Sequence, residues 1–147
     1  MKILLGFDDS PHSEAALHFI ETMTWPAGTR VLIVSAVRPE VGAFSEVFAT
    51  TGSHMDELWE EQVRRHEEIA ARAEQVLRKV GFTTEARVVH GDPRVSLVDL
   101  ARAEKADLMV LGSHGRTGLG KLVMGSVASH VVTHAPCNVL VVKLPTS

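Results

Sequence analysis

Three glycines and a serine late in the chain have the spacing of a loop that can bind a polyanion. Gly112, Gly115 and Gly125 are followed by Ser126, in the pattern Gly-x2-Gly-x9-Gly-Ser. Glycine lets a backbone approach a ligand closely, and the free N–H groups of such a loop can point at phosphate oxygens. An apolar run over residues 108–111 precedes the loop, and a helix is predicted to begin at Gly125–Ser126. The pattern therefore indicates a bound nucleotide.

Two better-known phosphate loops fit this stretch less well. The run Gly115–Lys121 nearly matches the loop of motor-type NTPases, but Leu122 stands where a Ser or Thr would hold Mg²⁺. Gly118 and Gly120 are followed by Val123, where a dinucleotide-binding fingerprint needs a third glycine. Both patterns fail, so neither class of site is predicted.

No catalytic or metal-binding pattern accompanies the loop. The nucleophile motif Gly-x-Ser-x-Gly is absent, and no residue stands out as a base for water attacking a γ-phosphate. His130 and His134 lie four residues apart, but no carboxylate or cysteine completes a zinc pattern. We therefore predict no catalytic residue and no protein-held metal. His114 differs, because it lies inside the loop, where it could contact ribose or phosphate and tune affinity through its protonation.

The elements that must position these residues follow from the apolar pattern. Four continuous apolar runs, residues 3–7, 31–37, 108–111 and 139–142, are typical of strands covered on both faces, while residues 85–89 alternate more and indicate an edge strand. Helices are predicted between them. Ser10 with Pro11 and Asp92 with Pro93 are cap-plus-proline starts, the long second helix covers about residues 54–80, and the fourth begins at Gly125.

The order of these elements predicts a single-domain, doubly wound, five-stranded parallel sheet with helices on both faces. In such a sheet the carboxyl ends of the strands converge on one crevice, which brings Asp8, Ala36 and the glycine loop together. On the second helix, apolar residues Leu58 to Leu77 form a stripe, and the outer face carries i, i+4 pairs that include Glu68–Arg72. Residues 39–53 have no clear period and are interpreted as a loop that could cover the site.

Composition limits the class of protein. The 147 residues fit one domain, and a net charge of −3 argues against a nucleic-acid binder. The single cysteine, Cys137, excludes an internal disulfide and is interpreted as an inert core thiol. The apolar run at the N-terminus is too short for a signal peptide or a membrane span. We therefore expect a cytoplasmic protein with no membrane contact.

The combination of motifs over the whole chain resembles the universal stress protein family, in its ATP-binding branch. The motifs are Lys2–Ser10, Val89–Pro93, Ala106–Arg116, Gly125–Ala128 and His134–Val142, together with the long middle helix. Asn138 departs from relatives, which often carry a second proline at this position, and we expect only a local effect on entry to the last strand.

The resemblance implies ATP, with Mg²⁺, in the crevice of an adenine nucleotide alpha hydrolase-like fold. Asp8 would lie by the ribose or the metal, and the backbone near Phe7 and Ala36 would lie by adenine. The other implied contacts surround the ribose and the phosphates: Gly112, His114, Gly115 and Arg116 on the loop, and Gly125, Ser126 and Val127 at the helix start. Ser126 is also predicted to cap that helix, since capping and phosphate binding use the same geometry.

The resemblance further implies a homodimer in which the apolar final strand, residues 138–143, pairs across a two-fold axis at the sheet edge. We expect an ATP-binding, nucleotide-responsive regulator or stress-tolerance factor with slow hydrolysis at most. Two alternatives stay open. One is a true ATPase or ATP-dependent phosphotransferase, and the other is a structural stress dimer that binds another adenine nucleotide, such as cyclic AMP, or none.

Overall fold

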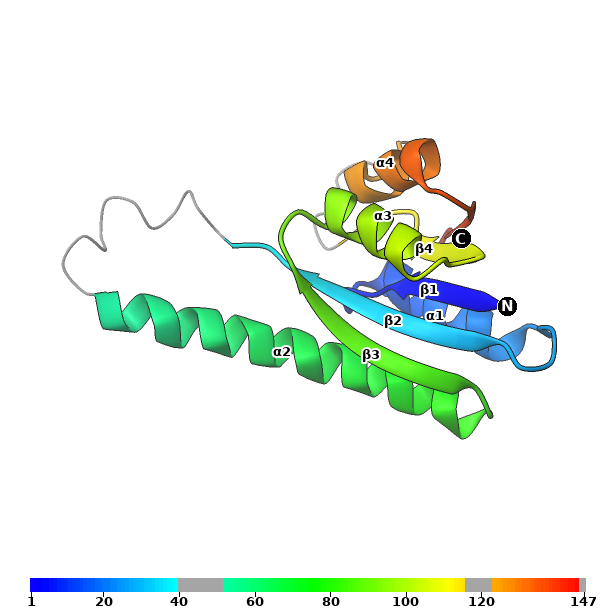
Figure 1. Ribbon diagram of the computed structural model, residues 1–147, viewed down its shortest axis with the longest axis horizontal. Coiled ribbons are helices and arrows are strands. Elements are labelled where there is room, and N and C mark those ends of the chain that lie inside the picture. Colours follow the sequence, from blue (N-terminus) through cyan, green and yellow to red (C-terminus); the bar gives the residue numbers. More distant parts are fainter. Residues whose placement is uncertain (40–51, 116–122, 146–147) are drawn as a thin grey trace.

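The computed structural model describes residues 1–39, 52–115 and 123–145 of the chain. Its elements are β1 (Lys2–Gly6), α1 (Pro11–Thr22), β2 (Arg30–Val37), α2 (Gly52–Lys79), β3 (Thr83–His90), α3 (Pro93–Ala103), β4 (Leu108–Gly112), α4 (Ser126–His134) and β5 (Asn138–Val142). The five strands run parallel in the order β3-β2-β1-β4-β5 (Figure 1). The predicted fold class is confirmed, and so is the position of β3 at an edge of the sheet.

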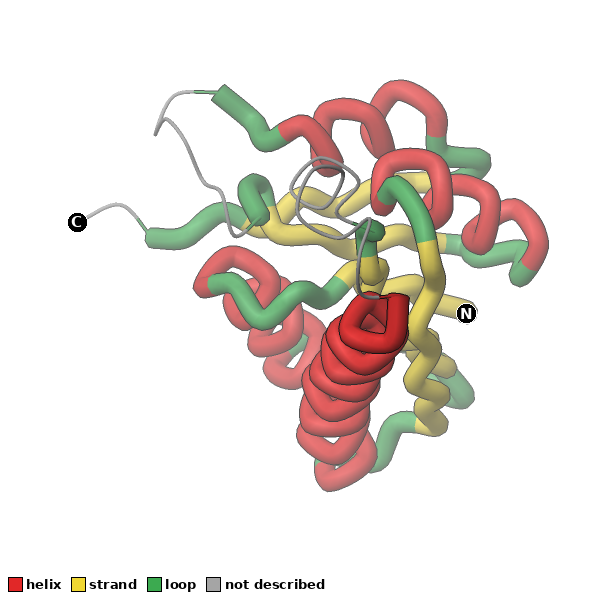
Figure 2. Tube along the Cα trace, turned by 90° about the vertical axis from the view of Figure 1, so that its left-hand side faces the viewer, coloured by secondary structure: helices red, strands yellow, loops and turns green. Residues whose placement is uncertain are grey.

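The sheet lies between two layers of helices, α1 with α2 on one face and α3 with α4 on the other (Figure 2). Successive residues of a strand point to opposite faces, so the continuous apolar runs supply both cores. On β1, Leu5 packs in the cluster that holds Ile20 and Leu77, whereas Leu4 packs in the cluster that holds Leu97. All five side chains are at most 4% exposed.

The strand order reverses direction between β1 and β4. From β1 the chain winds outward through β2 to β3, and it then crosses back to place β4 and β5 on the other side of β1. In open α/β sheets this reversal opens a crevice at the carboxyl ends of the two central strands. The segment that follows β1 and the loop that follows β4 therefore flank the same crevice.

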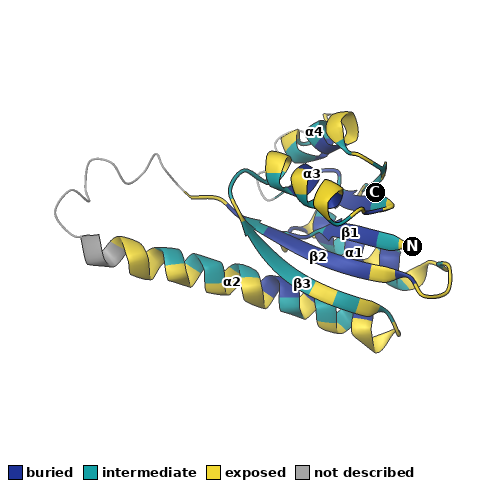
Figure 3. Ribbon diagram, viewed as in Figure 1, coloured by how far each residue is buried: buried dark blue, intermediate teal, exposed yellow. Residues whose placement is uncertain are grey.

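The apolar stripe predicted along α2 is only half right. Ile69, Ala73 and Leu77 are buried against the sheet, but Leu58 is 46% exposed, and no residue from 55 to 68 is buried. The reason is visible in Figures 1 and 3: the N-terminal part of α2 extends past the end of the sheet. Trp59 instead packs edge-on against His90, with ring centroids 5.3 Å apart.

The predicted pair of Glu68 with Arg72 is wrong. The Arg72 guanidinium donates to Asp9 Oδ1 at 2.7 Å and to the Glu14 carboxylate, and its carbon lies 5.4 Å from the centre of the Phe7 ring. Its pKa is raised, chiefly by the hydrogen bond to Glu14. Arg72 therefore ties α2 to the β1–α1 junction, at the edge of the crevice, through its ion pairs with Asp9 and Glu14.

Three smaller features complete the fold. Cys137 is partly buried beside the α3–α4 cluster, and burial raises the pKa of its thiol. Within the described ranges, no helix has the length and apolar character needed to cross a bilayer. Most of the predicted covering loop, residues 40–51, lies outside the described residues.

Candidate functional site

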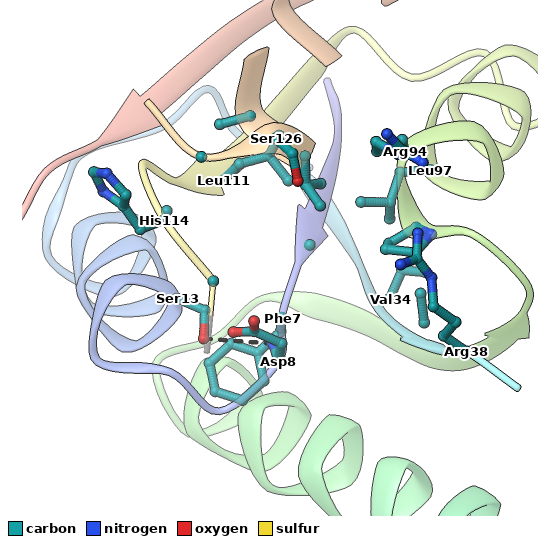
Figure 4. A pocket seen from close by; sticks show the side chains of 18 of the residues that line it. Phe7, Asp8, Ser13, Val34, Arg38, Arg94, Leu97, Leu111, His114 and Ser126 are labelled. Atoms are coloured by element: carbon teal, nitrogen blue, oxygen red, sulfur yellow. Dashed lines mark hydrogen bonds between the residues drawn. The ribbon is translucent and has the colours of Figure 1, made fainter. Parts of the chain in front are cut away.

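A cavity of about 750 Å³ lies at the carboxyl ends of β1, β2 and β4 (Figure 4). Its walls come from the end of β1, the ends of β2 and β4, the first turns of α3 and α4, and the middle of α2. Its size is within the range of small-molecule sites. Nine of the ten binding residues predicted from the sequence line it: Phe7, Asp8, Ala36, Gly112, His114, Gly115, Gly125, Ser126 and Val127. The tenth, Arg116, lies outside the described residues.

Asp8 is held by the turn that begins α1. Its Oδ1 accepts from the Ser10 N–H at 3.1 Å, and its own N–H contacts the Ser13 hydroxyl at 3.4 Å (Figure 4). Ser10 caps the helix, since its hydroxyl accepts from the Ser13 N–H at 3.2 Å. The other carboxylate oxygen, Oδ2, lies 3.0 Å from where a Cβ on Gly115 would stand. Asp8 thus lies close to the glycine loop at the edge of the cavity.

The end of β2 presents backbone groups to the cavity. The Phe7 N–H donates to the Val34 carbonyl at 2.9 Å, and the β1–β2 pairing ends one residue earlier, at Gly6. The backbone groups of alternate residues in a strand point to the same neighbouring strand. Those of Ala36 therefore point in the same direction as those of Val34, toward the β1 side, but lie beyond the end of β1. Ala36 accordingly lines the cavity with peptide groups that can read the edge of a flat, polar ring.

The first turn of α4 packs directly on the loop after β4. The N-cap is Gly125, which provides no side-chain cap, so the predicted capping role of Ser126 is wrong: Ser126 is the first helical residue and is exposed. The Gly125 N–H donates to the Ser113 carbonyl at 2.8 Å. A Cβ at Gly125 would stand 3.2 Å from both that oxygen and the His114 Cα. Glycine is therefore what allows the positive end of the helix to approach the loop.

Sequence reasoning missed His12, which completes a cluster behind the loop. Its Nδ1 lies 3.2 Å from the Ser113 hydroxyl, and that hydroxyl lies 3.0 Å from Nδ1 of His114. The pKa of His12 is lowered by burial and by His114, while Asp8 acts in the opposite sense. Gly112 makes room for this residue, because a Cβ there would stand 2.5 Å from the His12 carbonyl carbon. Since 101 residues separate His12 from Ser113, no local pattern could have indicated the contact.

Three arginines that the sequence did not single out also line the cavity: Arg38, Arg65 and Arg94. Asp92 accepts from Arg94 Nη2 at 2.6 Å and pairs with Arg38 Nη2 at 3.0 Å. These contacts hold the pKa of Asp92 well below its usual range, and the hydrogen bond with Arg94 contributes most. The motif Asp92–Pro93 was predicted only as a helix start. The motif also places Arg94 at the cavity, because α3 begins at the end of the sheet where the cavity lies.

The chemistry available at this cavity is binding of an anion and a polar ring. Cationic side chains and a helix N-terminus surround it, and Asp8 is a hydrogen-bond acceptor at its floor. Among the described residues, no group of three or more His, Cys, Asp or Glu side chains could hold a metal ion.

Comparison with known proteins places the whole chain beside one family. The model of the universal stress protein family matches residues 1–143. A universal stress protein of Thermus aquaticus is 32% identical over 142 residues, covering 96% of this chain and 97% of that protein. One from Methanocaldococcus jannaschii is 34% identical over 146 residues, covering 98% and 82%. The solved structure of the hypothetical protein MJ0577 superposes with a TM-score of 0.83 at 26% identity, covering 99% of this chain and 97% of that one.

More distant structures with this fold were solved with adenine nucleotides. A universal stress protein in complex with cAMP superposes with a TM-score of 0.66 at 24% identity, covering 97% of this chain and 95% of its own. The Archaeoglobus fulgidus universal stress protein in complex with dAMP gives 0.69 at 24%, covering 97% and 98%. These likenesses show the shared fold.

Proposed function

This chain belongs to the universal stress protein family, and on that premise we propose that its cavity binds an adenine nucleotide, in particular ATP with Mg²⁺. The complexes of related folds with cAMP and dAMP support adenine as the base. Binding would make the protein a nucleotide-responsive regulator or stress-tolerance factor in the cytoplasm, with slow hydrolysis at most.

The observation that carries the proposal is the placement of the α4 N-terminus. The helix begins at the crevice between β1 and β4, its N-cap Gly125 contributes no side chain, and Ser126 and Val127 line the cavity. The first N–H groups of a helix have no partner within the helix and carry its positive end. A phosphate chain is the ligand that such a terminus binds best.

The other groups fit the rest of the nucleotide. We assign the ribose hydroxyls to the Asp8 carboxylate, which the turn at Ser10 holds at the cavity floor. Adenine would lie against the backbone of Ala36 and the segment at Phe7. Gly112, His114 and Gly115 would surround the phosphates, as would Arg116, whose role stays a prediction.

Mg²⁺ fits this site as a companion of the phosphates. A hard cation takes oxygen ligands, and Mg²⁺ usually binds to proteins through only one or two carboxylates, with substrate phosphate oxygens and water completing its shell. When bound, the ion would neutralise phosphate charge. The part of the chain that the structure describes offers no cage for it, so affinity for the metal should depend on the nucleotide.

Calorimetry on nucleotide-stripped protein tests the proposal. We expect Mg-ATP to bind at one site per chain, and GTP to bind at least about tenfold more weakly because the base edge at Ala36 would not match. Tighter binding of cAMP than of ATP would change the ligand but keep the site. If no adenine nucleotide binds at millimolar concentration, the proposal is wrong. If ATP binds and is hydrolysed over multiple turnovers that depend on Asp8, the protein is instead an ATPase.

A further inference from the structure

A buried hydroxyl joins two imidazole rings behind the proposed phosphate end of the cavity. Ser113 is 3% exposed, and its Oγ lies 3.2 Å from His12 Nδ1 and 3.0 Å from His114 Nδ1. The two ring centroids are 4.9 Å apart. A hydroxyl has one proton to donate, so Ser113 can donate to only one of these nitrogens and must accept from the other.

The far side of His114 fixes the direction of these bonds. Its Nε2 contacts the backbone carbonyl oxygen of Val123, which can only accept, so Nε2 carries a proton. In neutral His114 the other nitrogen, Nδ1, then accepts from the Ser113 hydroxyl. Ser113 must in turn accept from Nδ1–H of His12. The result is a one-way chain of donors from His12 through Ser113 and His114 to Val123.

The same cluster accommodates one more proton without losing a hydrogen bond. If a proton binds His12 at Nε2, the Nδ1 proton of His12 passes to the Ser113 oxygen, and the original Ser113 proton passes to Nδ1 of His114. Afterwards His114 is a cation that donates from both ring nitrogens, Ser113 donates back to His12, and His12 is neutral. One proton enters, and the positive charge appears on His114, a residue that lines the cavity.

The charges around the pair favour this outcome. Burial and His114 lower the pKa of His12, which disfavours a charge on His12, although Asp8 acts in the opposite sense. Asp8 lies close to the loop at Gly115, and the positive end of α4 packs against His114 at Gly125. A phosphate chain in the cavity would add negative charge next to His114 and offset both the helix terminus and the loss of solvent.

We propose that His12, Ser113 and His114 form a proton relay that charges His114 when a phosphate group occupies the adjacent end of the cavity, so that binding of a nucleoside polyphosphate takes up one proton. This inference rests on the proposed function, because it names a regulation of the same site. Affinity for Mg-ATP would then rise as the pH falls, whereas affinity for adenosine, which has no phosphate, would not.

Calorimetry at about pH 6 and about pH 8, in two buffers of different ionisation enthalpy, measures the effect. A full proton taken up changes the dissociation constant about tenfold per pH unit, so over these two units we expect Mg-ATP to bind up to about a hundredfold more tightly at the lower pH. The Ser113→Ala and His12→Asn variants should lose most of this ratio. The titration of the nucleotide's own phosphates is the same for the wild type and all variants, so it cancels when their ratios are compared. His18→Asn, on the outer face of α1 with a side chain 72% exposed, is the matched control and should keep the ratio.

Nitrogen-15 NMR of the histidine rings tests the relay without nucleotide. At about pH 8 we expect the Nε2–H tautomer for His114 and the less common Nδ1–H tautomer for His12. If wild type, Ser113→Ala and His12→Asn share one pH dependence, or if the tautomers are reversed, the relay is refuted while ATP binding stands. If Mg-ATP binds at neither pH, the proposed function fails and the relay's link to binding fails with it.

Discussion

A methyl group at Gly115 should weaken nucleotide binding while sparing the fold. The Cβ of Gly115→Ala would stand 3.0 Å from Asp8 Oδ2, and the backbone at this position is not left-handed. The carboxylate can yield by a few tenths of an ångström, so we expect the free energy of unfolding to change by less than about 1 kcal/mol. The methyl group would nevertheless occupy the space between Asp8 and the loop, where ribose and phosphate are proposed to meet.

The size of the effect follows from linkage. At a Mg-ATP concentration of about 100 times the wild-type dissociation constant, bound ligand adds roughly 2.7 kcal/mol, which raises Tm by about 5–10 °C for a chain of this length. A variant that binds tenfold more weakly gains only about 1.4 kcal/mol at the same concentration, so its shift should be about half as large. Gly115→Val should abolish the shift. Thermal unfolding followed by circular dichroism, with and without Mg-ATP, measures both.

Gly112→Ala is the matched control with the opposite signature. Its Cβ would stand 2.5 Å from the carbonyl carbon and 2.7 Å from the carbonyl oxygen of His12, so backbone must move. Overpacking of this kind costs about 1–3 kcal/mol, which lowers the Tm of the ligand-free protein by several degrees. A full Mg-ATP shift in Gly115→Ala would refute the assignment of the loop to the ligand. An unchanged ligand-free Tm in Gly112→Ala would refute the packing argument.

Three further predictions concern the core, acid stability and assembly. Leu77→Ala empties a fully buried position and should cost about 2–5 kcal/mol in urea unfolding, whereas Leu58→Ala, at a site 46% exposed, should change stability by less than about 0.5 kcal/mol. Because Arg94 and Arg38 lower the pKa of Asp92, their ion pairs stabilise the fold above the ordinary carboxyl value of about 4 and are lost on further acidification. Asp92→Asn keeps a helix cap, so it should lose less stability than wild type between about pH 5 and about pH 3. In β5 the Val142 carbonyl accepts from the Ser113 N–H, so the Val141 N–H points away from β4, toward the free edge of the sheet. Val141→Pro removes that edge donor and should convert the expected homodimer to a monomer in light scattering. A wild-type monomer at micromolar concentration would contradict the dimer.

The sequence predicted the fold because its strongest signals are local. The central strands β1, β2 and β4 are buried on both faces, so runs such as residues 3–7 are apolar without interruption, and Ser10 and Asp92 cap the helices that they begin. What it could not predict depends on how far elements extend and which distant residues meet. Periodicity identifies the apolar face of α2, but only the sheet's length decides that burial begins at Ile69. Contacts of His12 with Ser113, or of Arg72 with Glu14, have no local signature.

The way the helices begin explains why the cavity forms where it does. In a parallel sheet every strand end faces a helix start, so the same few residues must either cap a helix or bind a ligand. Ser10 caps α1 and Asp92 caps α3 with their own side chains, so each of these helix starts has an internal acceptor for one of its free N–H groups. The start of α4 is different, because Gly125 has no side chain to offer and its packing against His114 leaves little space for one. Its first N–H groups are thus available to an external acceptor. The glycines therefore act together: Gly125 provides no side-chain cap, and the absence of side chains leaves room for a phosphate to accept hydrogen bonds from the first N–H groups of α4.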